Sequence, residues 1–77
     1  MNKCISAVSL GDYRLEVTYS DGAIVILNLS DLIKNRDSYW RCRQERYFSM
    51  IRVDPLGGLC WPEGEDLCLD GLSRYLE

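Results

Sequence analysis

The sequence predicts a small α+β domain, in which a three-strand antiparallel meander and a short hairpin accompany two or three short helices. Two observations carry this prediction. Hydrophobic and polar residues alternate along residues 13–19, and a nearly continuous apolar run at residues 23–29 follows after a turn. Alternation with a period of two is typical of a strand with one buried face, whereas an unbroken β-branched run is typical of a well-buried strand.

The predicted meander occupies the first third of the chain. Its three strands are expected at residues 5–10, 13–19 and 23–29. The pairs Gly11-Asp12 and Asp21-Gly22 separate them, and both suit tight hairpin turns that need positive φ. Because strands joined by short turns usually pair with their neighbours in sequence, we expect the three strands to lie side by side in chain order.

Two short helices are expected next. Ser30 is placed to cap a helix that ends near Asn35, with Asp31 favourably placed in its first turn. Residues 39–48 combine helical spacing with thin apolar content, which predicts a loop followed by a short helix around residues 44–48.

A hairpin and a last helix are expected after residue 48. Two short strands, at residues 49–54 and 59–61, flank a turn at residues 55–58. Pro62 ends the second strand because proline has no amide hydrogen to donate to a ladder. A final helix is expected to start at Asp66 or Leu69 and to run to Leu76.

Length and composition indicate one domain spanning residues 1–77. The chain is 47% hydrophobic and 27% charged, which is typical of a globular protein. A domain of this size buries only roughly 60% of the surface that its unfolded chain exposes, so dimerisation would add stability. No segment is long enough to span a membrane and the N-terminus does not resemble a signal peptide, so a cytoplasmic protein is expected.

Charge and residue types restrict the possible functions. The net charge of −3 gives no general attraction to nucleic-acid phosphates, although basic residues crowd the middle of the chain and acidic residues its end. The chain has no histidine, which removes histidine-based catalysis and histidine metal ligands. Its four cysteines form no Cys-x-x-Cys pair, so we expect packing thiols without disulfides or zinc, and no cofactor. They are Cys4, Cys42, Cys60 and Cys68.

Several segments together resemble a bacterial family, that of domain of unknown function 2442, over nearly the whole length. The segments are residues 12–22, 29–32, 47–54, Gly58, 61–67 and 70–72. The resemblance implies a small α+β domain with a bent antiparallel sheet and no established activity. Some members of the family carry an appended helix-turn-helix domain, and others are encoded beside another small protein, an arrangement like that of toxin–antitoxin pairs. The chain departs from the family pattern at Leu69, where proline is common, and at Gly71.

Two segments could carry a binding function. Arg41, Arg43 and Arg46 alternate with aromatic residues in segment 39–48, a combination found both in protein–protein hot spots and in single-strand nucleic-acid sites. A solvated loop with arginine stems covering apolar surface is the plain alternative. Because the whole chain is acidic, we expect a protein partner, which is a small protein encoded nearby or a second copy of the chain. The candidate contact residues are Tyr39, Trp40, Arg43, Tyr47 and Trp61.

The second segment is the acidic one at residues 63–70. Glu63, Glu65, Asp66 and Asp70 could form a metal or hydrolytic carboxylate site near Trp61. The alternative, which we prefer, has Trp61 packed over the sheet, Glu63 and Glu65 solvated, and Asp66 or Asp70 capping the last helix. The sequence therefore predicts a non-catalytic protein-interaction module, with a nucleic-acid-associated regulator acting through segment 39–48 as the alternative.

Overall fold

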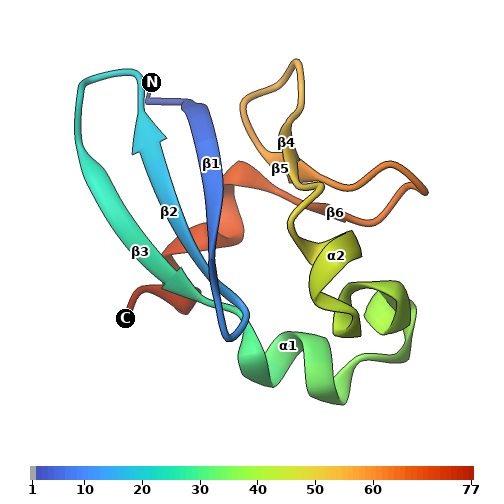
Figure 1. Cartoon of the computed structure of the whole chain (residues 1–77). Helices are drawn as coiled ribbons and strands as arrows, with labels where there is room; N and C mark the ends of the chain where they lie inside the picture. The colour runs from blue at the N-terminus through green and yellow to red at the C-terminus, as the bar shows by residue number, and fades with distance from the viewer. Residues whose placement is uncertain (1) are drawn as a thin grey trace.

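The first sheet consists of three antiparallel strands in the order β1-β2-β3 (Figure 1). They are β1 (Cys4–Gly11), β2 (Arg14–Tyr19) and β3 (Ile24–Asn28). The structure, a computed structural model, describes residues 2–77. Leu15 and Val17 of β2 are fully buried and Glu16 between them is exposed, as alternation predicts. The expected meander is confirmed, but the expectation that its third strand is well buried was wrong, because only Leu27 of β3 is fully buried.

The first hairpin turns one residue later than expected. Gly11 pairs with Arg14, so the two-residue loop is Asp12-Tyr13, with φ of 54° and 61°. A register shift between Ser9 and Gly11 moves the glycine out of the loop and into the ladder. A bulky residue such as tyrosine is uncommon at positive φ and needs support from its surroundings.

Tyr13 receives that support from residues far along the chain. Its hydroxyl donates to the backbone carbonyl of Arg43 at 2.7 Å, and its ring packs edge-on against Phe48 with centroids 5.6 Å apart. The backbone amide of Leu29 also donates to the carbonyl of Tyr13. The tip of the first hairpin is therefore attached to the segment that follows the meander.

Three short helices follow β3. They are α1 (Ser30–Asn35), the 3₁₀ helix η1 (Asp37–Arg43) and α2 (Glu45–Phe48). The expectation that Ser30 caps α1 was wrong, because its hydroxyl donates to Oδ1 of Asn28 at 2.7 Å and α1 has no side-chain cap. Oδ1 of Asn28 also accepts the backbone amide of Ser30. The structure also replaces the expected loop before α2 with η1.

A second sheet has the order β4-β5-β6, with two residues in each strand. The strands are β4 (Arg52–Val53), β5 (Leu59–Cys60) and β6 (Asp66–Leu67). The expected hairpin thus gains a third strand, and Asp66 lies in that strand and not at a helix start. The last helix is η2 (Leu69–Tyr75), which has no side-chain cap, so the expected capping by Asp66 or Asp70 was wrong.

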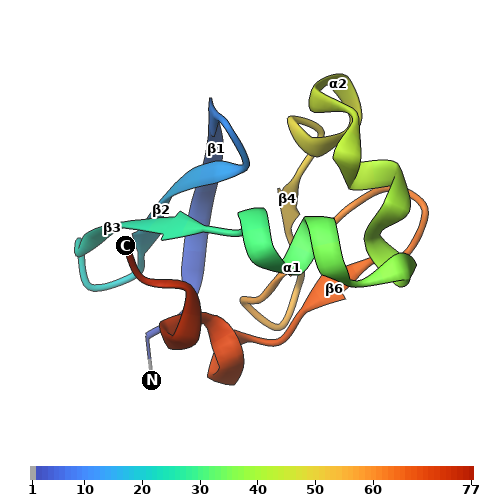
Figure 2. The same cartoon turned by 90° about the horizontal axis from the view of Figure 1, so that it is seen from below.

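The two sheets lie side by side, with β1 in contact with β4, and α1 lies below both of them in the view of Figure 1 (Figures 1 and 2). The predicted α+β class is confirmed, but its strands form two three-stranded sheets. β5 and β6 approach closely at Gly58, where an added Cβ would lie 2.6 Å from the carbonyl oxygen of Leu67. Among the described residues, no helix is long and apolar enough to cross a membrane.

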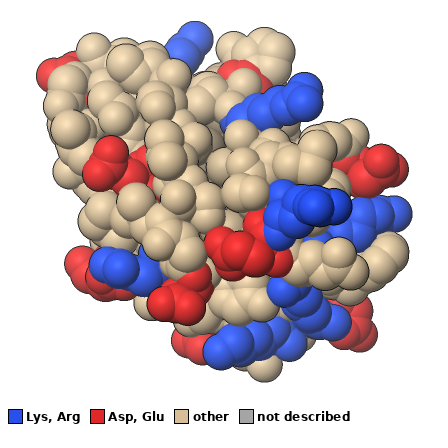
Figure 3. All heavy atoms as spheres, viewed as in Figure 1, with Lys and Arg blue, Asp and Glu red and all other residues tan. Residues whose placement is uncertain are grey.

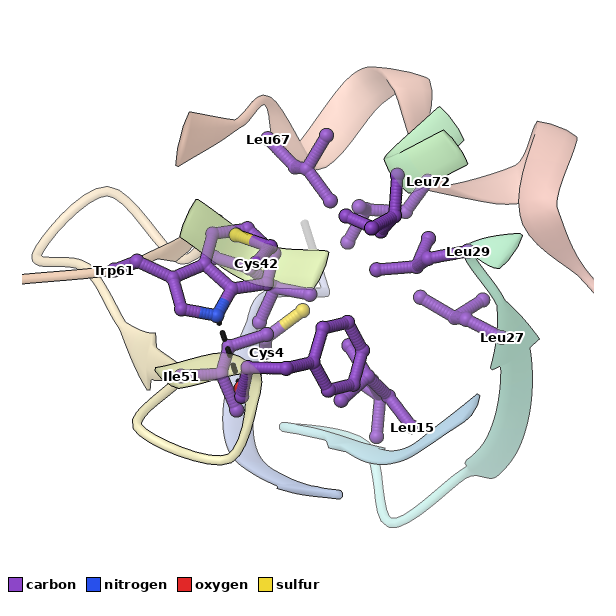
Figure 4. Packing of buried hydrophobic residues seen from close by; sticks show 13 residues of the cluster. Cys4, Leu15, Leu27, Leu29, Cys42, Ile51, Trp61, Leu67 and Leu72 are labelled. Carbon is purple, nitrogen blue, oxygen red and sulfur yellow. Dashed lines mark hydrogen bonds between the residues drawn. The ribbon is translucent and has the colours of Figure 1, made fainter. Parts of the chain in front are cut away.

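One core joins the two sheets (Figure 4). Leu15 and Leu27 enter it from the first sheet, whereas Leu59 and Trp61 enter it from the second, and Phe48 lies fully buried between the two sides. The indole N–H of Trp61 donates to the carbonyl of Phe48 at 2.9 Å. The preferred expectation that Trp61 packs inside the domain is confirmed.

The four cysteines are free thiols. Cys4 and Cys42 belong to the core, and burial raises the pKa of the Cys42 thiol to about 12. Cys60 is half-buried and Cys68 is exposed. The expected packing role therefore fits the first two cysteines better than the last two.

Candidate functional site

Residues 30–48, which we call the basic lobe, form α1, η1 and α2. This segment carries five basic and three acidic side chains, whereas the rest of the chain carries four basic and nine acidic ones. α1 contacts η1, and η1 contacts α2. Figure 3 shows Lys and Arg side chains gathering over the lower right of this face, where Figure 1 places α1 and α2. The net charge of the whole chain therefore conceals a locally positive region.

Glu65 is the one charged residue in the core of the described chain, at 8% exposure. Its Oε1 accepts the hydroxyl of Tyr47 at 2.6 Å, and its Oε2 accepts Nη1 of Arg41 at 3.1 Å. The oxygen of Tyr47 in turn accepts the backbone amide of Glu63 at 2.9 Å. The expectation that Glu65 is solvated was wrong, because the basic lobe supplies two donors that compensate its burial.

These contacts set the ionisation of Glu65 and Tyr47. Burial raises the pKa of Glu65, but the bonds from Tyr47, the backbone and Arg41 outweigh burial and bring its pKa below the ordinary value. Burial, and then the hydrogen bond to Glu65, raise the pKa of the Tyr47 hydroxyl. Glu65 is therefore an anion and Tyr47 a neutral donor at neutral pH.

Arg41 links this buried carboxylate to the surface. Its Cζ atom lies 4.7 Å from the centre of the Trp40 ring, over the ring face. The Trp40 side chain remains 54% exposed. We call Trp40, Arg41 and Glu65 the Trp40 platform, since a buried anion holds a guanidinium that in turn covers one face of an exposed indole.

Arg43 has a structural task that sequence reasoning did not identify. Its Nε donates to the carbonyl of Ile33 at 2.9 Å, and its Nη2 lies 3.4 Å from the carbonyl of Lys34. These are carbonyls of the last turn of α1, which lack helical partners. Arg43 therefore caps α1, although 39% of its side chain stays exposed.

The other expected contact residues differ in exposure. Tyr39 is half-buried, donates its hydroxyl to the carbonyl of Asp66 at 2.8 Å and packs edge-on against Trp61. Tyr47 is half-buried against Glu65. Trp61, at 2% exposure, offers no surface to a partner and is no longer a contact candidate. The structure thus leaves Trp40 as the most exposed of the aromatic candidates.

Two shallow hollows border the lobe and share Tyr39 and Asp66. One, of about 490 Å³, lies between η1 and η2, with Arg36 and Arg74 among its lining residues. The other, of about 300 Å³, is lined by Arg41, Glu63 and Glu65 among others.

The carboxylates of the acidic segment do not gather into a group of metal ligands. Within residues 2–77, no group of three or more His, Cys, Asp or Glu side chains is arranged to hold an ion. Glu65 faces Arg41 and Tyr47, so its two carboxylate oxygens are already occupied. The segment therefore contributes to the fold through Glu65.

The fold and the lobe together define a small α+β domain with a locally basic surface. The family model described as "Protein of unknown function (DUF2442)" matches residues 5–76. The chain belongs to the DUF2442 family, and the resemblance noted in the sequence is confirmed.

A solved structure gives the same fold. It is that of a protein from Nitrosomonas europaea described as a putative DNA binding protein, with a TM-score of 0.84 at 18% sequence identity. The match covers 97% of this chain and 48% of that chain, so the chain spans about half the length of its neighbour. At this identity the likeness shows the fold alone. Among curated proteins, none matches the sequence.

Proposed function

We propose that the protein is a non-catalytic, nucleic-acid-associated module that contacts phosphates through the basic lobe. The proposal is supported by the exposure and the ion pairing of the lobe's basic side chains. Arg41 and Arg43 are engaged in ion pairs, but Lys34, Arg36 and Arg46 are exposed and have no ion pair within the described chain. Exposed cations without acidic partners are what phosphate binding requires.

The proposal revises the preference for a protein partner. That preference rested on the lack of a recognisable nucleic-acid motif and on the net charge of −3, which is a property of the whole chain. Electrostatic attraction depends on the local field, and most of the acidic residues lie outside the lobe. The similarity in fold to a protein described as a putative DNA binding protein adds support.

Fluorescence anisotropy of labelled oligonucleotides over a series of salt concentrations tests the proposal. Binding should weaken as the salt concentration rises. In the double variant Arg36→Ala/Arg46→Ala, the negative slope of log K against log[salt] should become shallower by roughly 1 for each phosphate that the variant no longer neutralises. The matched control is Lys3→Ala/Arg52→Ala, which removes the same charge from exposed positions outside the lobe. No binding at low salt, or equal losses in both double variants, would contradict the proposal.

The absence of catalysis is part of the proposal. Without histidine, acid–base chemistry at neutral pH would depend on carboxylates or cysteines, and Glu65 is committed to an ion pair. Oligonucleotides incubated with the protein should stay intact on a denaturing gel, with and without magnesium. Cleavage that disappears in Glu65→Gln would overturn this part.

A protein-interaction module is the second candidate, favoured by a different surface. Ile5, Val8, Leu10 and Ile24 of the first sheet are 46–63% exposed. Exposed apolar side chains often mark contacts between proteins when they gather on one surface, and these lie on β1 and β3. Light scattering should then report a dimer that Ile24→Lys dissociates, or a neighbouring gene product should co-purify. A monomer that captures no such partner would eliminate this candidate.

A further inference from the structure

We propose that the Trp40 platform is a stacking site for an unpaired nucleobase, so that the module prefers single-stranded over double-stranded nucleic acid. The inference rests on the proposed function and names its substrate class. A base in a duplex has both faces covered by its neighbours, whereas a base in a single strand offers a face to an aromatic side chain. Trp40 is the aromatic side chain that this surface leaves exposed, at 54%.

Contacts with Arg41 and Glu65 hold the Trp40 side chain in place. Arg41 lies over one face of Trp40, at 4.7 Å from the ring centre, and a 3.1 Å bond to the buried Glu65 holds the guanidinium. Tyr47 fixes the other oxygen of Glu65 at 2.6 Å. Because Arg41 supports one face of the indole, the Trp40 side chain is already partly ordered before a base stacks on its other face. Binding of the base therefore costs less side-chain entropy. A flexible tryptophan on a solvated loop would lack this advantage.

The lobe is poorly shaped for reading a duplex. The major groove admits an α-helix or a two-stranded ribbon, whose side chains reach the base edges. The α-helices of the lobe, α1 and α2, have six and four residues, which is less than two turns each. The paired strands lie outside the lobe, and Glu16 stands on the exposed face of β2.

The other exposed charges of the basic lobe suit the flexible phosphate backbone of a single strand. Arg36 and Arg46 flank η1 on either side in sequence, and both are exposed. Single-strand sites combine cations that attract phosphates with aromatic rings on which bases stack, and the lobe carries both. Such a site discriminates weakly between bases, because every base has a stacking face.

Tryptophan fluorescence and anisotropy titrations test the inference. The probes are single-stranded oligothymidylate and a mixed-sequence duplex of equal length, both at low salt. The single strand should quench the emission of Trp40, while the buried Trp61 gives a constant background. Trp40→Ala should weaken single-strand binding about tenfold, the effect of losing one stacked base, and leave duplex binding unchanged. Trp40→Phe should keep most of the affinity because it keeps a ring.

Controls separate this inference from the proposed function. Leu56→Ala removes another exposed apolar side chain, at 82% exposure, and should have no effect on either ligand. If Arg36→Ala/Arg46→Ala weakens binding but Trp40→Ala leaves the affinity for the single strand unchanged, the proposed function stands and the stacking site is refuted. Equal losses for the single strand and the duplex in Trp40→Ala would also refute it. If Trp40→Ala alters only self-association or capture of a protein partner, the ring is a protein contact and the inference is overturned.

Discussion

The two sheets of this protein are held together in different ways. The first has strands of five to eight residues, joined by a long antiparallel ladder. The second has strands of two residues, and side chains supply many of the hydrogen bonds around it. Asp54 accepts the backbone amides of Leu56 and Gly58, and Tyr39 donates to the carbonyl of Asp66. A regular ladder follows from a local pattern, whereas a sheet this short depends on specific partners elsewhere in the chain.

Phe48 tests whether the two regions unfold together. It is fully buried, and its ring contacts Tyr13 of the first region and Trp61 of the second. Phe48→Ala should cost about 3–5 kcal/mol of unfolding free energy, which is a large part of the stability of a small domain. Urea unfolding followed by tryptophan emission and by far-ultraviolet circular dichroism should give one shifted transition. Two separate transitions would mean that the regions are independent.

Glu65 tests the side-chain network that supports the second region. Glu65→Ala leaves the Arg41 guanidinium and the Tyr47 hydroxyl without their acceptor and should cost about 2–3 kcal/mol. Glu63→Ala, two residues away and exposed, is the matched control and should cost less than about 0.5 kcal/mol. Both values come from chemical denaturation at pH 7. Equal effects would show that the buried contacts add nothing to stability.

Substitution of one glycine in each region compares how well the two backbones tolerate an added Cβ. Gly58→Ala would place its Cβ 2.6 Å from the carbonyl oxygen of Leu67, a backbone atom that must move, and we expect a loss of about 1–3 kcal/mol. Gly22→Ala meets nothing within 4 Å and bears only the penalty of its φ of +91°, about 1 kcal/mol. Thermal melts of both variants measure the difference. A larger loss of stability for Gly22→Ala than for Gly58→Ala would contradict the expectation that the close contact at Gly58 makes the second region less tolerant.

The smallest effect is a pH dependence that belongs to the second region. The pKa of Glu65 is lowered in the folded protein, so its contribution is fully present above the unfolded-state pKa of about 4.3 and is lost as the pH falls through the folded-state pKa. The stability difference between the wild-type protein and Glu65→Gln should therefore shrink as the pH is lowered from about 6 towards about 3. A difference that stays constant over this range would argue against the ionised pair.

The sequence predicted the parts of the fold that follow from local patterns. Alternation over residues 13–19 located β2, and the apolar run located β3. The turn was misplaced by one residue because a register shift absorbs Gly11, and no local pattern indicates such a shift. β6 was missed because two residues are too short for a period to be recognised.

The candidate site was predicted in outline only. Segment 39–48 was identified from its arginine and aromatic content, and Trp40 and Arg41 do meet on the surface. Glu65 was expected in solvent as one of several carboxylates in the acidic segment 63–70. Its burial depends on Tyr47 and Arg41, which are 18 and 24 residues away, so local sequence reasoning has no access to it.

The left-handed turn at Tyr13 has a consequence for how the molecule opens. Its side chain attaches the tip of the first hairpin to Arg43 and Phe48 of the basic lobe. Local unfolding of the lobe must therefore break this attachment or carry the hairpin with it. Amide hydrogens near Phe48 should exchange with solvent at rates coupled to those of the hairpin tip, as one cooperative unit, and Tyr13→Phe should accelerate exchange at both places.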